Sequence, residues 1–311
     1  MPAKVKRPVT AKSNEPSPSM TLTVLGSGSA FSRLYGTTCS LLRLRDGRAW
    51  LIDCGRQAPD QLWARGLTWW DIDGQIITHV HGDHAYGLED FALMRYYGGA
   101  NVGRSVLSGG AKPTLVAHSA VLAEIWEFLA PSLRYRGDEN ARTTTGGLQD
   151  YFTVLEPGTL EKPHGASWNH SETFRTPGLE LTVRETQHVP TKPSTALEIV
   201  VDGEGDRIAW WGGDSIVDAD RLVELEPRTV VFFHDCTFTE HPGIVHAAFS
   251  HLKKLPRRVR EKIVLMHHDD NLADHRAAAL EQGFRLLLPG VVVDLQTGCF
   301  VSEAAATARG G

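Results

Sequence analysis

Three histidines and an aspartate lie within six consecutive positions of the sequence. They are His79, His81, Asp83 and His84, and they follow a short apolar run directly. Neutral imidazole and carboxylate are the ligands that zinc and similar divalent ions prefer. Side chains two residues apart at the end of a strand point to the same face, so His79 and His81 can approach one ion together. The stretch therefore predicts a metal site at the end of a strand and in the turn that follows.

Three further side chains of metal-ligand type follow apolar segments elsewhere in the chain. They are His188, Asp214 and His267, and each stands at the end of a predicted strand. A strand end presents its side chain at the edge of a sheet, and with these three the candidate ligands number seven, enough for two ions. The neighbouring His268 is the alternative to His267. The register of the preceding strand favours His267, with His268 lining the pocket.

The rest of the sequence predicts the elements that would position these residues. Strands are predicted at 21–25, 38–44, 49–52, 75–77, 114–117, 196–201, 207–211, 229–233, 262–266 and 291–295, with a strand pair over 174–189. Helices are predicted at 57–65, 87–97, 120–129, 245–255 and 271–281. This order is typical of two sheets packed face to face with helices outside. Gly- and Pro-rich segments at 135–150 and 156–172 predict irregular insertions.

The order of the first histidines and the aspartate resembles the metal-binding signature of the metallo-β-lactamase superfamily. The resemblance implies an α/β fold, a four-layer αβ/βα sandwich of two mixed sheets flanked by helices. It also implies two divalent metal ions along the sheet edges, with zinc expected and manganese or iron as alternatives. One ion would be held by His79, His81 and His188, the other by Asp83, His84 and His267, with Asp214 bridging them.

Two metal ions about 3.5–4 Å apart can share a water molecule and lower its pKa to near 7. A metal-bridging hydroxide would then be available at neutral pH without a nucleophilic side chain, with Asp83 among the catalytic residues. A purely structural zinc is disfavoured, because structural sites are closed by four ligands. The predicted chemistry is hydrolysis.

Further motifs resemble the ribonuclease Z-like branch of the superfamily, which includes cyclic phosphodiesterases. They are the Gly-Ser-Gly-Ser turn at 26–29, the Asp-Cys-Gly at 53–55 and the His-Asp-Cys-Thr at 234–237. His246 follows about where this branch has a phosphate-contacting histidine. The resemblance implies a phosphodiesterase for a nucleotide, cyclic nucleotide or RNA substrate. His246 or His234 would contact phosphate or transfer a proton, and Asp235 would orient a histidine.

Two departures from ribonuclease Z argue against tRNA processing. Arg56 stands where ribonuclease Z has an acid, and Asp269 and Asp270 replace the Ser-x-Arg-Tyr segment expected after the last ligand. The sequence also has no evident Lys-rich arm for gripping tRNA. Phosphodiester hydrolysis remains the leading function. Hydrolysis of a carboxyl ester, lactone or sulfate ester on the same metal site is the alternative.

The composition is that of a globular protein long enough for a sizeable core, with 311 residues, of which 41% are hydrophobic and 22% charged. The net charge of −5 shows no global basic character of the kind typical of nucleic-acid-binding proteins. One basic run at 253–262 is typical of a solvated helix face. No apolar run reaches membrane-spanning length, so no membrane partner is expected. The expected partner is a small-molecule or nucleotide phosphodiester, with RNA and a homodimer left open.

The candidate ligands span much of the chain, which favours one domain. The sequence predicts a metallo-β-lactamase-like domain at 20–303, a disordered basic tail at 1–19 and a flexible C-terminal tail at 304–311. The four cysteines form no Cys-x-x-Cys pair and are predicted to be reduced, buried thiols of a cytoplasmic protein. They are Cys39, Cys54, Cys236 and Cys299.

Overall fold

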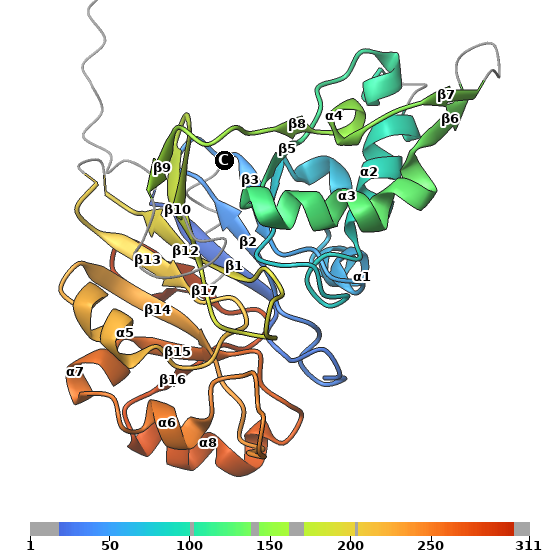
Figure 1. Ribbon diagram of the computed structural model, residues 1–311. Coiled ribbons are helices and arrows are strands. Elements are labelled where there is room, and N and C mark those ends of the chain that lie inside the picture. Colours follow the sequence, from blue (N-terminus) through green and yellow to red (C-terminus); the bar gives the residue numbers. More distant parts are fainter. Residues whose placement is uncertain (1–18, 100–102, 138–142, 162–170, 203–204, 302–311) are drawn as a thin grey trace, which may run out of the picture.

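The computed structural model describes residues 19–99, 103–137, 143–161, 171–202 and 205–301. Both predicted tails lie outside these residues, apart from Ser19. Two large sheets that pack face to face form the centre of the described chain (Figure 1).

The first sheet has eight strands and joins the two ends of the described chain. Its order is β18 (Phe300–Val301), β17 (Val292–Asp294), β1 (Thr21–Gly26), β2 (Cys39–Arg43), β3 (Ala49–Ile52), β4 (Gly74–Ile76), β5 (Thr114–Val116) and β8 (Thr153–Val154). Strands β17, β1, β2 and β3 pair antiparallel, whereas β3, β4, β5 and β8 pair parallel. The sheet is therefore mixed, as the sequence predicts.

The second sheet is also mixed and has eight strands. Its order is β16 (Arg285–Leu286), β15 (Ile263–Met266), β14 (Thr229–Asp235), β13 (Ile208–Trp211), β12 (Thr195–Val200), β11 (Leu179–Glu185), β10 (Ser171–Thr176) and β9 (Thr159–Glu161). Leu179, Leu181 and Val183 of β11 are buried while the residues between them are partly exposed. This period of two places one face of the strand in the core between the sheets.

Helices cover the outer faces of both sheets (Figure 1). The first sheet carries α1 (Ala58–Trp63), α2 (Leu88–Tyr97), α3 (Ser119–Leu133) and α4 (Leu148–Tyr151). The second carries α5 (Ala219–Leu225), α6 (Phe249–Leu252), α7 (Arg257–Arg260) and α8 (Leu272–Glu281). Three hydrophobic clusters result, one between the sheets and one under each helical layer. The predicted four-layer sandwich is confirmed.

Several local predictions differ from the structure. The predicted helix at 245–255 is wrong at its start, because Ala248 pairs with Thr237 and the residues before it are irregular, with a bend at His246. The segment predicted to be irregular at 135–150 contains the hairpin of β6 (Tyr135–Gly137) and β7 (Thr143–Thr145), followed by α4. Cys299 is exposed, since it lies in the turn between β17 and β18, whereas the other three cysteines are buried.

None of the helices in the described part of the chain combines the length and the apolarity that crossing a lipid bilayer requires.

Candidate metal centre

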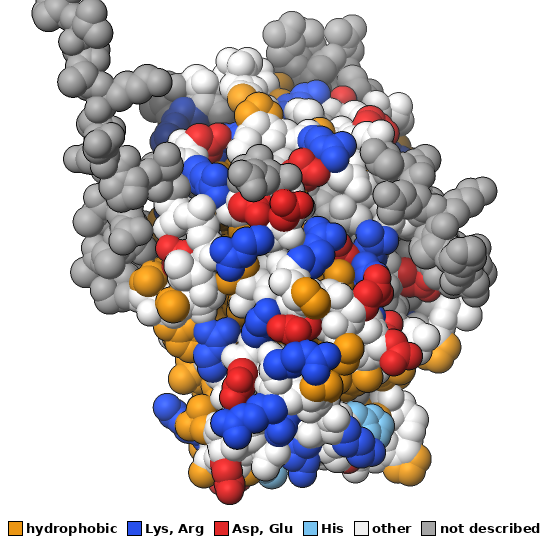
Figure 2. Space-filling view, turned by 90° about the vertical axis from the view of Figure 1, so that its left-hand side faces the viewer, with side chains coloured by type: hydrophobic (Ala, Val, Ile, Leu, Met, Phe, Trp, Pro, Cys, Tyr) orange, Lys and Arg blue, Asp and Glu red, His pale blue; other side chains and the backbone are white. Residues whose placement is uncertain are grey.

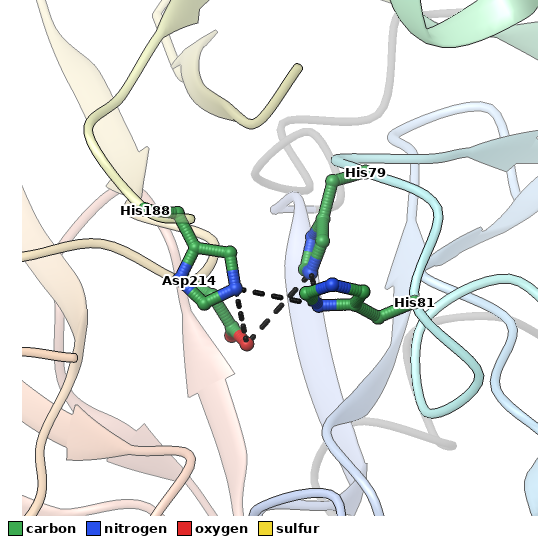
Figure 3. A group of neighbouring side chains, drawn as sticks. All are labelled: His79, His81, His188 and Asp214. Carbon is green, nitrogen blue, oxygen red and sulfur yellow. Dashed lines mark hydrogen bonds and ion pairs between the residues drawn. The ribbon is translucent and has the colours of Figure 1, made fainter. Parts of the chain in front are cut away.

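Four candidate ligands converge between the two sheets (Figure 3). His79 and His81 come from the loop after β4, His188 from the loop after β11 and Asp214 from the loop after β13. Their ligand atoms all lie within 4.8 Å of one another. Nδ1 of His81 is 3.0 Å from Nε2 of His79 and 3.3 Å from Nε2 of His188. Three imidazole nitrogens and a carboxylate are a donor set that suits one zinc-class ion.

A second group of candidate ligands shares Asp214 with the first. Asp83, His84, Asp214 and His267 also have ligand atoms within 4.8 Å of one another. Oδ2 of Asp83 lies 3.2 Å from Nε2 of both His84 and His267. Oδ2 of Asp214 lies 3.2 Å from Nε2 of His267 and 3.8 Å from Nε2 of His79. One carboxylate therefore lies between two ligand groups, where it could bridge two ions.

Unsatisfied atoms in the cluster indicate that these residues fit metal ions. Nε2 of His84 and Oδ1 of Asp214 are buried and have no hydrogen-bond partner among the described residues, although they lie 3.3 Å apart. A buried polar atom without a partner costs roughly 1–3 kcal/mol. A divalent ion would take the lone pairs of both atoms. Mixed imidazole and carboxylate donors suit zinc, manganese or iron.

Hydrogen bonds behind the ligands fix the orientation of their rings. Nδ1 of His84 donates to the Asp53 carboxylate at 2.9 Å, and Nδ1 of His188 donates to the Val245 carbonyl at 3.0 Å. The Thr78 hydroxyl donates to Asp53 and lies 3.1 Å from Nδ1 of His79. Each of these three imidazoles therefore presents Nε2 to the cluster. Asp53 thus supports two ligands at once.

Two residues of this centre have backbone conformations that only glycine adopts readily. The φ angle is 62° at Asp53 and 55° at His267. Such conformations cost of order 1–3 kcal/mol and persist where the surrounding structure demands them. The strained backbone at Asp53 places its carboxylate behind the ligand His84, and the strained backbone at His267 places its imidazole among the ligands.

The electrostatics of the two groups differ. Burial lowers the pKa of His79 well below its usual value and lowers the pKa of His81 to about 4, so both rings are neutral lone-pair donors. Burial also lowers the pKa of His84, but the carboxylates of Asp214 and Asp83 outweigh burial and raise it well above its usual value. The negative charge that holds a proton on His84 would equally attract a cation, because metal binding and protonation compete for the same lone pair.

His246 and Asp235 adjoin the shared end of the cluster and form, with Asp214 and His267, a third group of possible metal ligands. Nδ1 of His246 donates to Oδ2 of Asp235 at 2.7 Å, and it lies 4.0 Å from Oδ2 of Asp214. The ring of His246 stacks on that of His267 with centroids 5.0 Å apart. Burial lowers the pKa of His246, but Asp235 outweighs burial and raises the pKa to about 9. His246 lies in a bend of the irregular segment before α6 rather than in a helix, and this segment brings it to the cluster.

Comparison of the whole sequence with known proteins gives the family. Residues 20–288 match the family described as Anti-Pycsar protein Apyc1. The chain belongs to the Apyc1 family. The Apyc1 protein of Paenibacillus harenae is 32% identical over 259 residues, which cover 83% of this chain and 93% of the relative. The Apyc1 protein of Bacillus phage 010DV004 is 32% identical over 257 residues, covering 82% of this chain and 91% of the relative.

Solved structures place this Apyc1-family chain in the metallo-β-lactamase fold. YhfI from Bacillus subtilis, a metallo-β-lactamase fold protein, superposes with a TM-score of 0.61 at 17% identity, covering 88% of this chain and 98% of YhfI. The short form of human tRNase Z gives 0.59 at 19% identity, with 89% and 99% covered. A diphosphatase of the PhnP family gives 0.60 at 18% identity, with 88% and 97% covered. The predicted metallo-β-lactamase fold is confirmed, and the Apyc1 family match together with these neighbours supports a hydrolytic, phosphodiesterase-like enzyme.

Two histidines considered in the sequence analysis lie away from the cluster. His234 points to the outer face of β14, where its ring lies 5.3 Å from that of Trp210, because neighbouring side chains of a strand alternate and Asp235 takes the inner side. His268 is fully buried rather than lining a pocket. Its Nε2 donates to the Leu287 carbonyl at 3.1 Å, and its ring meets Tyr35 edge-on.

The departure at Asp269 and Asp270 has a structural role in this member of the Apyc1 family. The Ser29 hydroxyl donates to Asp269 at 2.6 Å, and the Ser32 hydroxyl donates to Asp270 at 2.6 Å. Asp270 also accepts the backbone N–H groups of Arg33 and Leu34. The two carboxylates therefore anchor the loop after β1 beside the strand end that carries His267.

Three of the six basic residues in the run at 253–262 pair with neighbouring acids. Arg257 pairs with Glu261, while Arg258 and Lys262 both pair with Glu226. The face that carries α5 and α7 mixes acidic and basic side chains and shows no uniform basic surface (Figure 2). This arrangement of charges is more typical of a solvated surface than of a surface that binds an RNA backbone.

Proposed function

We propose that this chain is a phosphodiesterase that hydrolyses cyclic nucleotides with two divalent ions of the zinc class. The observation that carries the proposal is the pair of ligand groups that share Asp214 between the sheets. Membership of the Apyc1 family and the likeness of the sequence motifs to cyclic phosphodiesterases support the choice of substrate. The pairing of part of the basic run with acids, and the mixed charge of the face that carries it, favour a small nucleotide over RNA.

In this proposal the ligand roles follow the two groups. His79, His81 and His188 would hold one ion, whereas Asp83, His84 and His267 would hold the other, and Asp214 would be shared by the two groups. When bound, such ions supply a water of lowered pKa and polarise the phosphoryl oxygen. Asp83 reaches both imidazoles of its group, so it also fixes their separation.

His246 and Asp235 supply the proton that the leaving group needs. Asp235 holds Nδ1 of His246, which leaves Nε2 to carry the transferable proton. As a water oxygen bonds to phosphorus and the water gives up one proton, the bond between phosphorus and one ribose oxygen breaks. That ribose oxygen takes the proton from Nε2, and the proton that the water lost restores the imidazolium. The product is a nucleoside monophosphate. The side chain of His246 is 29% exposed, so a substrate can reach it.

The test is turnover by the full-length protein loaded with zinc or manganese. The panel contains purine and pyrimidine 3′,5′-cyclic nucleotides, a short RNA, an aryl ester and a lactone. We expect metal-dependent conversion of at least one cyclic nucleotide to its monophosphate. Faster turnover of the ester or lactone would instead support the alternative hydrolase, and failure with every phosphodiester would overturn the proposal.

A further inference from the structure

A cavity of about 670 Å³ lies on the outer face of the second sheet, behind the metal centre. This outer cavity is lined by residues of β10 to β14, by the loops after β11 and β13 and by the start of α5. Its volume falls within the roughly 300–1,000 Å³ of small-molecule sites in proteins. The ligand groups of the metal centre are not among its lining residues, so the outer cavity is a separate space.

Buried polar atoms in the wall of the outer cavity lack partners. The hydroxyls of Ser171 and Ser215 belong to residues that are only 2% exposed, and neither hydroxyl has a hydrogen-bond partner among the described residues. Oε2 of Glu185 is likewise buried and unpartnered within the described part of the chain. Burial raises the pKa of Glu185 above its usual value, as expected for a carboxylate without a compensating donor. These three oxygen atoms therefore lack hydrogen-bond donors, and a ligand in the cavity could supply them.

Most of the remaining polar groups in the wall are acceptors. Nδ1 of His234 donates to the carbonyl of Asp235 at 2.8 Å, which leaves Nε2 of the neutral ring as an acceptor. Asp218 and Asp220 add two carboxylates at the start of α5. With Glu185 the lining has three carboxylates, and these favour a positively charged donor over an anion.

The two arginines of the wall are committed to a neighbouring acid. Arg184 Nε and Arg221 Nη2 both donate to Oε1 of Glu198 at 2.6 Å, and Glu198 is 4% exposed. Arg221 also pairs with Glu224. One carboxylate thus holds both guanidinium groups and offsets part of their charge, so they do little to recruit an anionic ligand.

An apolar surface completes the outer cavity. Trp210, Ala196 and Leu222 line it and belong to the hydrophobic cluster under α5. The rings of Trp210 and His234 lie 5.3 Å apart at an interplanar angle of 34°. Aromatic faces of this kind attract organic cations as well as flat apolar rings.

We propose that the outer cavity is a second ligand site, for an organic cation that carries a primary ammonium group on an apolar or aromatic body. The ammonium group would donate to Glu185 and to the unpartnered serine hydroxyls, and the apolar body would lie against Trp210. The site is separate from the metal centre and requires no covalent chemistry. Its existence does not depend on which ester the metal centre hydrolyses.

The first test compares three probes that share an indole ring and differ in charge. Tryptamine is a cation, tryptophol is neutral and indole-3-propionate is an anion. We expect calorimetry with the full-length, metal-loaded protein to show saturable binding of tryptamine. Tryptophol should bind at least about tenfold more weakly, because its neutral hydroxyl replaces the charged ammonium donor. Indole-3-propionate should not bind.

Two variants locate the binding site. Glu185→Gln keeps the shape of the side chain but removes its charge, so tryptamine affinity should fall about tenfold or more. Ala219→Trp places a large ring at an exposed lining position of α5 and should abolish binding. Ala277→Trp makes the same exchange at an exposed position of α8 and is the matched control, with unchanged affinity expected.

The proposal is overturned if the folded protein shows no saturable tryptamine binding. It is also overturned if tryptophol binds as tightly as tryptamine, or if Ala219→Trp and Ala277→Trp bind tryptamine equally well. Thermal unfolding of each variant shows whether it is folded. If Glu185→Gln does not fold, the pair of tryptophan variants still decides the location of the site.

Discussion

The metal centre and the outer cavity lie on opposite faces of one strand and are built in opposite ways. Asp235 and His234 are neighbours on β14, yet Asp235 faces the metal centre and His234 faces the outer cavity. The metal centre gathers side chains from strand ends of both sheets into one cluster of lone pairs. The outer cavity uses one face of one sheet and a helix. The difference shows that residue type alone does not assign a histidine to a catalytic centre. The face of the strand to which its side chain points determines whether it reaches the metal centre.

Among substitutions that test this difference between the two sites, we expect Asp214→Asn to have the largest effect on metal binding and turnover. The substitution removes the charge shared by the two ligand groups, and an amide oxygen is a poorer bridge. We expect the protein to lose at least one metal ion and nearly all turnover. Metal content by mass spectrometry, measured beside initial rates, checks this. Full two-metal occupancy in the variant would refute the bridging role.

A smaller effect is expected from His246→Ala. The variant should keep its metal content and lose roughly 10²–10⁴-fold in turnover, the range for a positioned general acid. Since the ring lies outside both ligand groups proposed here, metal content separates a catalytic role from a ligand role. An unchanged rate would show that the role of His246 is structural. Loss of metal from the variant would show that His246 is a metal ligand.

Asp53→Asn should weaken metal binding without destroying the site. Asparagine tolerates the positive φ angle at this position, so the backbone can be retained. The variant loses the charge behind His84 and Thr78, and the expected loss of metal affinity is roughly 10–100-fold. Competition with a chelator measures this affinity. An affinity equal to that of the unmodified protein would show that Asp53 only shapes the backbone.

The smallest effect on hydrolysis is expected from His234→Gln. Its ring contacts Trp210 on the outer face, so turnover and metal content should both match the unmodified protein. Initial rates under saturating substrate check this. A loss of turnover comparable to that of His246→Ala would break the contrast between the two faces of β14.

The sequence singled out the side chains that the structure gathers into the two ligand groups, because the signal is local. His79, His81, Asp83 and His84 lie within six residues, and the other candidates stand directly at strand ends, so little tertiary knowledge was needed. The two sheets and their helical layers followed from the order of strands and helices. The choice of His267 over His268 followed from strand register, and the structure brings His267 to the cluster.

Other features depend on contacts that no short pattern contains. Asp53 was visible as part of an Asp-Cys-Gly motif, but its bond to His84 spans 31 positions and its positive φ angle leaves no signature in sequence. The helix predicted around His246 failed because pairing with Thr237 overrides local propensity. The alternation of side chains on β14 could have separated His234 from Asp235, but only knowledge of which face meets the first sheet says which of them belongs to the metal centre.

The most direct test of the account is the number and position of metal ions in the unmodified protein. A crystal structure of the zinc-loaded chain, with anomalous scattering at the zinc edge, gives both. We expect two ions, one beside His79, His81 and His188 and the other beside Asp83, His84 and His267, with Asp214 contacting both. A single ion closed by four protein ligands, or ions bound away from Asp214, would contradict the proposed centre.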